Sequence, residues 1–124
     1  MKVPGFIVKQ FYVGGSLRNA GDGFELQARN PMGNGLLVEI RRISVDGLTI
    51  PASAVTARRV GSDQDVRATD VSRLTPVAFR KGDAITFHIS GSHLSPGRHR
   101  LELEIVERDA GLLQLSLEDT LAAA

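Results

Sequence analysis

The feature that most constrains the fold of this chain is a strict alternation of apolar and polar side chains. In RHRLELEI (98–105), Leu101, Leu103 and Ile105 alternate with charged residues. The same period of two runs through GFELQARN (23–30), DAITFHIS (83–90) and GLLQLSLE (111–118). Because successive side chains of a strand point to opposite faces, each segment predicts a half-buried β-strand. Such strands are typical of antiparallel sheets.

Turn residues separate these segments. Asp46-Gly47 predicts a two-residue hairpin, and Pro96-Gly97 predicts a turn with a positive φ at the glycine. The inward apolar residues stand at even positions up to Ile40 and at odd positions from Ile43 onward. We therefore expect one extra residue, a β-bulge, near Arg41-Arg42, so that both sets face the same side of the sheet. Further strands are expected at about 5–13, 54–60, 64–71 and 76–80.

About eight short, turn-linked strands predict an all-β fold. We expect a single-domain antiparallel β-sandwich over residues 1–124, jelly-roll or immunoglobulin-like, with residues 1–4 and 120–124 frayed. With 42% hydrophobic residues, a chain of this length can build a core without disulfides.

Composition narrows the function classes. The formal net charge is only +1, whereas nucleic-acid binders rely on a basic excess, so we expect no nucleic-acid partner. No apolar stretch approaches the length of a membrane span, and the start of the chain lacks the pattern of a secretory signal, so we expect no membrane partner. The absence of cysteine fits a reducing compartment, and we expect a cytoplasmic protein.

The residues show no self-contained active site. His88 lies on the polar face of its strand, His93 in a loop, and His99 has the inward parity of Leu101, so three histidines on different faces predict no metal site. We expect His99 to be a capping or core-edge residue whose ring nitrogen bonds a carbonyl. The carboxylates look like outward strand positions, so we predict no catalytic residue and no metal ligand, and no substrate-binding residue can be named.

The dipeptide Arg-Asn occurs twice, as Arg18-Asn19 and Arg29-Asn30. The two copies would lie near opposite ends of the sandwich, or one of them would fold back through the Gly21–Gly23 turn. We expect both asparagines to bond loop backbone. The two arginines would pair with carboxylates of this chain or of a partner, because arginine suits fixed bidentate contacts.

Several motifs in order resemble the small β subunit of bacterial carbon-glycoside deglycosidases. They are SLRN (16–19), DGFELQARNP (22–31), VDG (45–47), PVAFRKGDAITF (76–87) and LSPGRH (94–99). The resemblance covers Ser16 to about Leu121, although the segment 48–75 looks generic.

This resemblance implies a β-sandwich subunit that packs on a large, barrel-type catalytic α subunit. That partner would carry a divalent metal, typically manganese, and the complex would act as a carbon–carbon lyase that eliminates the aglycone of 3-oxo-glucosides. The present chain would hold no cofactor, would not be catalytic alone, and would meet the C-glycoside substrate only through the complex.

For the interface with this partner we expect six residues: Phe11, Tyr12, Arg18, Asn19, Arg29 and Asn30. Phe6, Leu36 and Leu112 are further apolar candidates, because obligate interfaces have a hydrophobic centre. The competing hypothesis is a free-standing β-sandwich module that binds a carbohydrate or a protein without catalysis.

Overall fold

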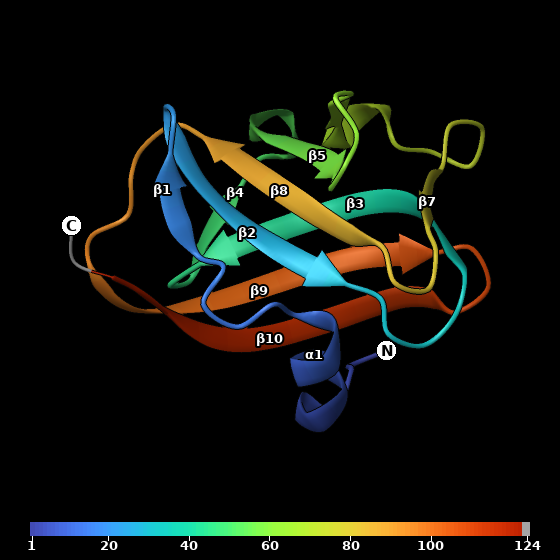
Figure 1. Ribbon diagram of the computed structural model, residues 1–124, viewed down its shortest axis with the longest axis horizontal. Coiled ribbons are helices and arrows are strands. Elements are labelled where there is room, and N and C mark those ends of the chain that lie inside the picture. Colours follow the sequence, from blue (N-terminus) through green and yellow to red (C-terminus); the bar gives the residue numbers. More distant parts are fainter. Residues whose placement is uncertain (123–124) are drawn as a thin grey trace.

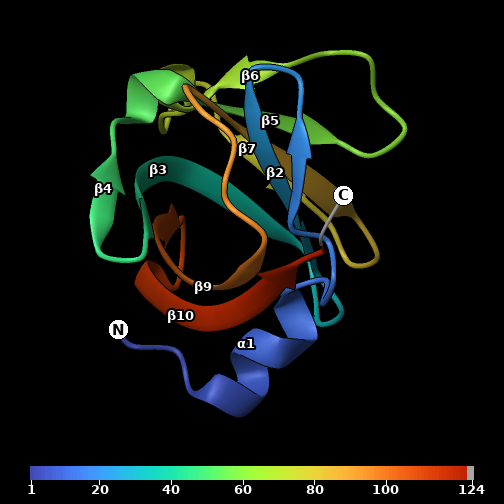
Figure 2. The same cartoon turned by 90° about the vertical axis from the view of Figure 1, so that its left-hand side faces the viewer.

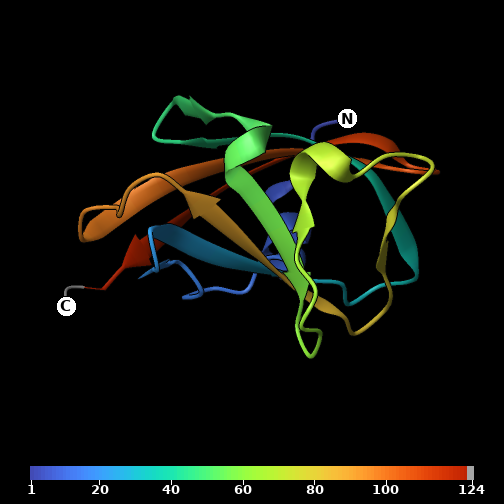
Figure 3. The same ribbon diagram turned by 90° about the horizontal axis from the view of Figure 1, so that it is seen from above.

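The chain folds into two antiparallel β-sheets packed face to face, as the computed structural model shows for residues 1–122 (Figure 1). Sheet I has the order β1-β2-β8-β5-β6, and sheet II has the order β10-β9-β3-β4, with β7 also paired to β3. The predicted all-β sandwich is therefore confirmed, with ten strands within residues 1–122 rather than about eight. Seen at right angles, sheet II curves beneath sheet I (Figure 2), and the strands of sheet I cross over it (Figure 3).

The elements follow one another along the chain with short connections. They are α1 (Gly5–Phe11), β1 (Arg18–Ala20), β2 (Gly23–Arg29), β3 (Gly35–Val45), β4 (Leu48–Ile50), the 3₁₀ turn η1 (Ala52–Ala54), β5 (Val55–Arg59), β6 (Val66–Arg67), the 3₁₀ turn η2 (Ala68–Asp70), β7 (Val77–Phe79), β8 (Ala84–Ser90), β9 (Gly97–Glu107) and β10 (Gly111–Leu121).

The core lies between the inner faces of the two sheets. Leu26, Ile85 and Leu101, all at the inward positions of their alternating segments, are fully buried. Burial of each such side chain stabilises the fold by about 1.5–3 kcal/mol. Gly23 is required where β2 meets β8, because an added Cβ would lie 1.8 Å from the Ile89 carbonyl oxygen.

Two local predictions are confirmed. Asp46 and Gly47 both have positive φ, 52° and 84°, and connect β3 to β4 as a tight hairpin. The register between β3 and β9 shifts between Ile40 and Arg42, which is the expected bulge. A second shift beside Val38 was not predicted.

The expected strand at 5–13 is wrong, because residues 5–11 form α1. Ile7 and Phe11 are one helical turn apart, and the buried Val8 anchors the helix, which packs against β10. A seven-residue helix is marginal by itself, so these tertiary contacts decide its conformation against the β-propensity of its apolar run.

The expected strand at 64–71 is only partly formed. Val66 and Arg67 make β6, and the chain then turns into η2, where Ala68 is buried. The strands expected at 54–60 and 76–80 are present as β5 and β7.

Both ends of the described chain are hydrogen-bonded in the structure. Val3 donates its N–H to the carbonyl of Gln114 at 2.9 Å, and the backbone of Thr120 and Leu121 is paired with β9. Residues 123–124, which belong to the segment expected to fray, lie outside the described residues. No helix within residues 1–122 is long and apolar enough to cross a membrane.

Candidate functional site

An apolar cavity of about 540 Å³ opens at one end of the sandwich. We call it the end cavity. Its walls come from residues 1–4, from α1, from the inner faces of β3, β9 and β10, from β7, and from the loop between β2 and β3. The principal apolar side chains are Ile7, Phe11, Leu37, Phe79, Ile105 and Leu115.

Methionines border the end cavity on the solvent side. Met1 is 66% exposed and Met32 is 60% exposed, and both line the opening. Exposed apolar side chains that continue a concave apolar surface mark interaction sites rather than ordinary surface. Methionine is also suited to variable packing contacts because its side chain is flexible and polarisable.

Asn30 organises one rim of the end cavity. The side chain is 4% exposed, donates to the carbonyl oxygens of Phe79 and Gly33, and accepts the N–H groups of Met32 and Gly33. It therefore bonds loop backbone, as expected, and its amide is fully used in shaping the loop.

Glu107 organises the opposite rim. Its carboxylate accepts the N–H groups of Leu36 at 3.0 Å and of Asp109 and Ala110 at 2.8 Å each. Although partial burial favours the neutral acid, these bonds hold the pKa of Glu107 below its usual value. The rim carboxylate is thus ionised and already satisfied, which leaves the cavity an apolar surface.

At the far end of the sandwich, His99 connects the β3–β4 hairpin to the loop before β9 by hydrogen bonds. Its Nδ1 lies 2.6 Å from Asp46 Oδ2 and its Nε2 lies 2.7 Å from the Ser95 carbonyl oxygen. The Ser95 carbonyl and the Asp46 carboxylate both raise the pKa of His99, because both favour the protonated ring. The prediction of a core-edge histidine bonded to a carbonyl is confirmed, with Asp46 as an additional partner.

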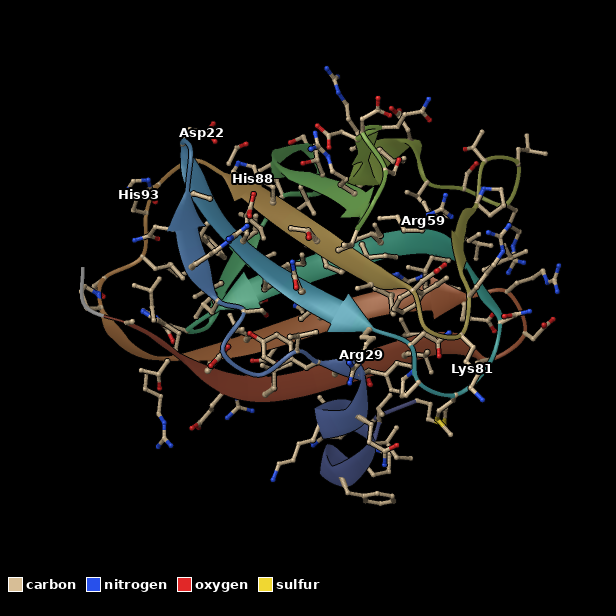
Figure 4. The ribbon with its side chains drawn as sticks, viewed as in Figure 1. Asp22, Arg29, Arg59, Lys81, His88 and His93 are labelled. Atoms are coloured by element: carbon tan, nitrogen blue, oxygen red, sulfur yellow. The ribbon has the colours of Figure 1, made fainter. Side chains whose placement is uncertain are left out.

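Near the same end, His88 bridges two carboxylates. Its Nε2 lies 2.9 Å from Asp22 Oδ1 and its Nδ1 lies 3.2 Å from Glu25 Oε2. Figure 4 shows Asp22, His88 and His93 gathered where β1 and β2 meet, whereas Arg29 and Lys81 lie toward the opposite end. Within residues 1–122, no group of three His, Asp or Glu side chains is arranged to hold a metal ion.

The structure distributes the expected interface residues over different regions. Arg18 pairs with Glu25 at 2.8 Å, and Asn19 exchanges two hydrogen bonds with the backbone of Leu94. The strand folds back through the Gly21–Gly23 turn, so Arg18 lies opposite Glu25 rather than at the far end of β2. Arg29 is exposed at the end of β2.

The aromatic pair lies next to the end cavity. Phe11 and Tyr12 are partly buried against the core, and the Tyr12 hydroxyl donates to Asp119. Burial and this carboxylate raise the pKa of Tyr12. Of the candidate residues, only Phe11 and Asn30 line the cavity. Ile7, Met32 and Phe79 also line the cavity but were not predicted as site residues. In the sequence they are ordinary apolar residues and cannot be told apart from those of the core.

These features define a class: a small β-sandwich domain with hydrogen-bonded loops at one end and an open apolar cavity at the other. A comparison with protein families matches residues 7–122 to the family described as hydroxymethylglutaryl-CoA reductase, N-terminal domain. The chain therefore belongs to this family. No curated protein matches the chain.

The family match corrects the resemblance to carbon-glycoside deglycosidases. The assignment as a deglycosidase β subunit, with lyase activity and a role in carbohydrate metabolism, is wrong, and the match over residues 7–122 overturns it. The motifs that suggested it are mostly turns and strand ends, such as Lys81-Gly82-Asp83 and Pro96-Gly97. These serve the geometry of antiparallel sheets in many β domains, so their order does not specify a function. The barrel-type partner and its metal were implied by that resemblance alone.

Proposed function

We propose that this chain is an accessory, non-catalytic domain that docks through the end cavity on the catalytic part of a hydroxymethylglutaryl-CoA reductase. The family described by that name supports the choice of partner. A cytoplasmic location is part of this proposal, on the basis of the cysteine-free sequence.

The observation that carries the proposal is the apolar character of the end cavity. Its rim groups Asn30 and Glu107 are engaged with loop backbone, so a ligand or partner meets mainly carbon and sulfur atoms. A cavity of this kind accepts apolar side chains from a protein surface, which is how interface anchors contribute most of the binding energy.

The non-catalytic character is supported by how the ionisable groups are used. His99 and Glu107 hold loops, and Asp119 accepts bonds from the Tyr12 hydroxyl and from the N–H groups of Gly15 and Leu17. Groups committed to backbone in this way are not arranged around one position where a substrate atom could react.

Co-expression with the catalytic part of a reductase tests the proposal. Met32→Glu and Ile7→Glu place a charge at the cavity and should weaken co-purification by about tenfold or more, because a desolvated, unpaired charge is costly. Leu48→Glu and Leu74→Glu are matched controls, since these leucines are 73% and 94% exposed and lie outside the cavity. Circular dichroism should show that all four variants remain folded.

Three results would overturn the proposal. They are no association with the reductase, equal loss of association in the cavity and control variants, and reduction of hydroxymethylglutaryl-CoA by the chain alone.

A further inference from the structure

The outer face of sheet I carries a second feature, independent of the end cavity and of the proposed docking. Strand register places Arg18, Glu25, His88, Thr56 and Arg67 side by side in one row across all five strands. The neighbouring row contains Gln27, Thr86 and Arg58. Together with Asp65, parts of these rows line a hollow of about 360 Å³. We call it the polar hollow.

Two arginines reach the polar hollow from opposite sides, and each is held by a carboxylate. Arg18 donates through Nε and Nη2 to Glu25 Oε1, at 3.2 and 2.8 Å. Arg58 donates through Nε to Asp65 Oδ1 at 2.6 Å. A guanidinium oriented by a carboxylate on one edge keeps its other edge available for a second oxyanion, and its planar geometry suits two parallel hydrogen bonds.

The carboxylate of Glu25, which lies beside Arg18 in the hollow, has both oxygens engaged in hydrogen bonds. Glu25 Oε1 accepts Arg18, and Glu25 Oε2 lies 3.2 Å from His88 Nδ1. His88 in turn has an acceptor at each nitrogen, and the hydrogen bond to Asp22, followed by that to Glu25, raises its pKa. These contacts favour the protonated ring of His88 and occupy the acceptor atoms around it.

The remaining groups are mainly donors. Among residues 1–122, no acceptor engages Nη1 of Arg18 or either Nη of Arg58. Thr86 Oγ1 accepts a hydrogen bond from Gln27 at 3.1 Å, which leaves the hydroxyl proton of Thr86 to be donated. Thr56 also lines the hollow. The principal vacant acceptor is Asp65 Oδ2, so unused donors outnumber unused acceptors.

We propose that the polar hollow binds an oxyanion, the carboxylate or phosphate group of a small molecule, between Arg58, Arg18 and the two threonine hydroxyls. The anion would receive bidentate hydrogen bonds from a preoriented guanidinium and a third from a hydroxyl group. Arg29, Arg59 and Lys81 are also exposed cations, but none of them forms an ion pair within residues 1–122 that would orient it.

The test is an NMR titration of the ¹⁵N-labelled chain with inorganic phosphate and, separately, with acetate, at constant ionic strength set with sodium chloride. We expect saturable shifts of the amides of Thr56, Arg58, Thr86 and His88. A response to phosphate alone identifies a phosphate group as the ligand, and a response to acetate identifies a carboxylate.

Variants separate the polar hollow from general surface charge. Arg58→Gln should weaken binding about tenfold, and Thr86→Val severalfold, because each removes a donor to the anion. Arg59→Gln is the matched control: it removes the same charge one residue further along β5, outside the hollow, and should leave binding unchanged. The spectra of the variants report whether the fold is retained.

The proposal is overturned by the absence of saturation with both anions, by shifts centred on Arg29 and Lys81, or by equal losses in Arg58→Gln and Arg59→Gln. None of these outcomes bears on docking at the end cavity, so the two proposals fail separately.

Discussion

The two ends of the sandwich are built in contrasting ways. At the end where β1 meets β2, side chains tie loop to loop: Asn19 bonds Leu94, His93 Nε2 lies 2.8 Å from the Gly21 carbonyl oxygen, and His99 joins the β3–β4 hairpin to β9. We call this the locked end. At the other end, α1 and the β2–β3 loop surround the apolar end cavity.

The contrast between the two ends shows that one fold can place the contacts that stabilise it at one end and a surface for interaction at the other. At the locked end, the hydrogen bonds of Asn19, His93 and His99 engage the polar side-chain atoms and hold the loops in one arrangement. At the cavity end, the polar atoms also bond to backbone, but they surround apolar surface that the chain leaves uncovered. An end of the first kind contributes to folding, whereas an end of the second kind is stabilised further when a partner covers it.

The largest expected effect is at the locked end. His99→Ala should lower the free energy of unfolding by about 2–4 kcal/mol, because it removes two hydrogen bonds from a buried ring, one of them to a carboxylate. Urea unfolding followed by circular dichroism measures the loss. His93→Ala is the comparison: it removes a single hydrogen bond at an exposed position, where water replaces the lost partner, so the change should stay below about 1 kcal/mol. Equal effects in the two variants would show that the end is not locked by His99.

A smaller loss is expected at the rim of the end cavity. Asn30→Ala should lower the free energy of unfolding by about 1–3 kcal/mol, because the carbonyls of Phe79 and Gly33 lose a donor. These bonds are between neutral groups, which makes them weaker than the charged pair at His99. The same urea measurement applies. A loss larger than that of His99→Ala would reverse the comparison between the two ends.

The pH dependence should be the smallest effect, and above pH 6 it belongs to the locked end. Acceptors raise the pKa of His99 and of His88 above the ordinary value of 6.5, so the protonated rings favour the folded state. This contribution is complete below about pH 6.5 and is lost as the pH rises through the raised folded-state pKa. Stability measured between pH 6 and about pH 9 should therefore decline, and His99→Gln should reduce the slope.

On the acidic side the sign is reversed. The Arg100 N–H and then His99 lower the pKa of Asp46, and backbone N–H groups lower that of Glu107. These carboxylates stabilise the fold above their ordinary pKa, and that contribution disappears as the pH falls through the lowered values. A stability that keeps rising from pH 6 to pH 9 would contradict the raised pKa of His99 and of His88.

Local patterns made much of the sheet predictable. The alternation of Leu101, Leu103 and Ile105 placed β9 and its inner face, and Asp46-Gly47 placed a hairpin. The change of parity after Ile40 located a bulge. Each of these depends on a short-range rule, the period of two or the φ that a turn requires, so the sequence is sufficient.

The functional surfaces were not predictable in this way. Arg18, Glu25, His88 and Arg58 converge through the pairing of β1, β2, β8 and β5, although Arg18 and His88 are 70 residues apart in the chain. Short turn motifs instead suggested the carbon-glycoside deglycosidases, and the family match over residues 7–122 showed this assignment to be wrong. A motif of turns describes how strands connect and carries little information about what the surface binds.

By itself, the sequence determined which residues form most strands, which face each strand buries, and where the hairpin and one bulge occur, because side-chain period and turn conformation are local properties. Only the tertiary structure decided that residues 5–11 form a helix, that His99 meets Asp46, and that an apolar cavity remains beside Asn30. These features depend on contacts between distant segments, and the energy of such contacts outweighs the small local preference of any one segment.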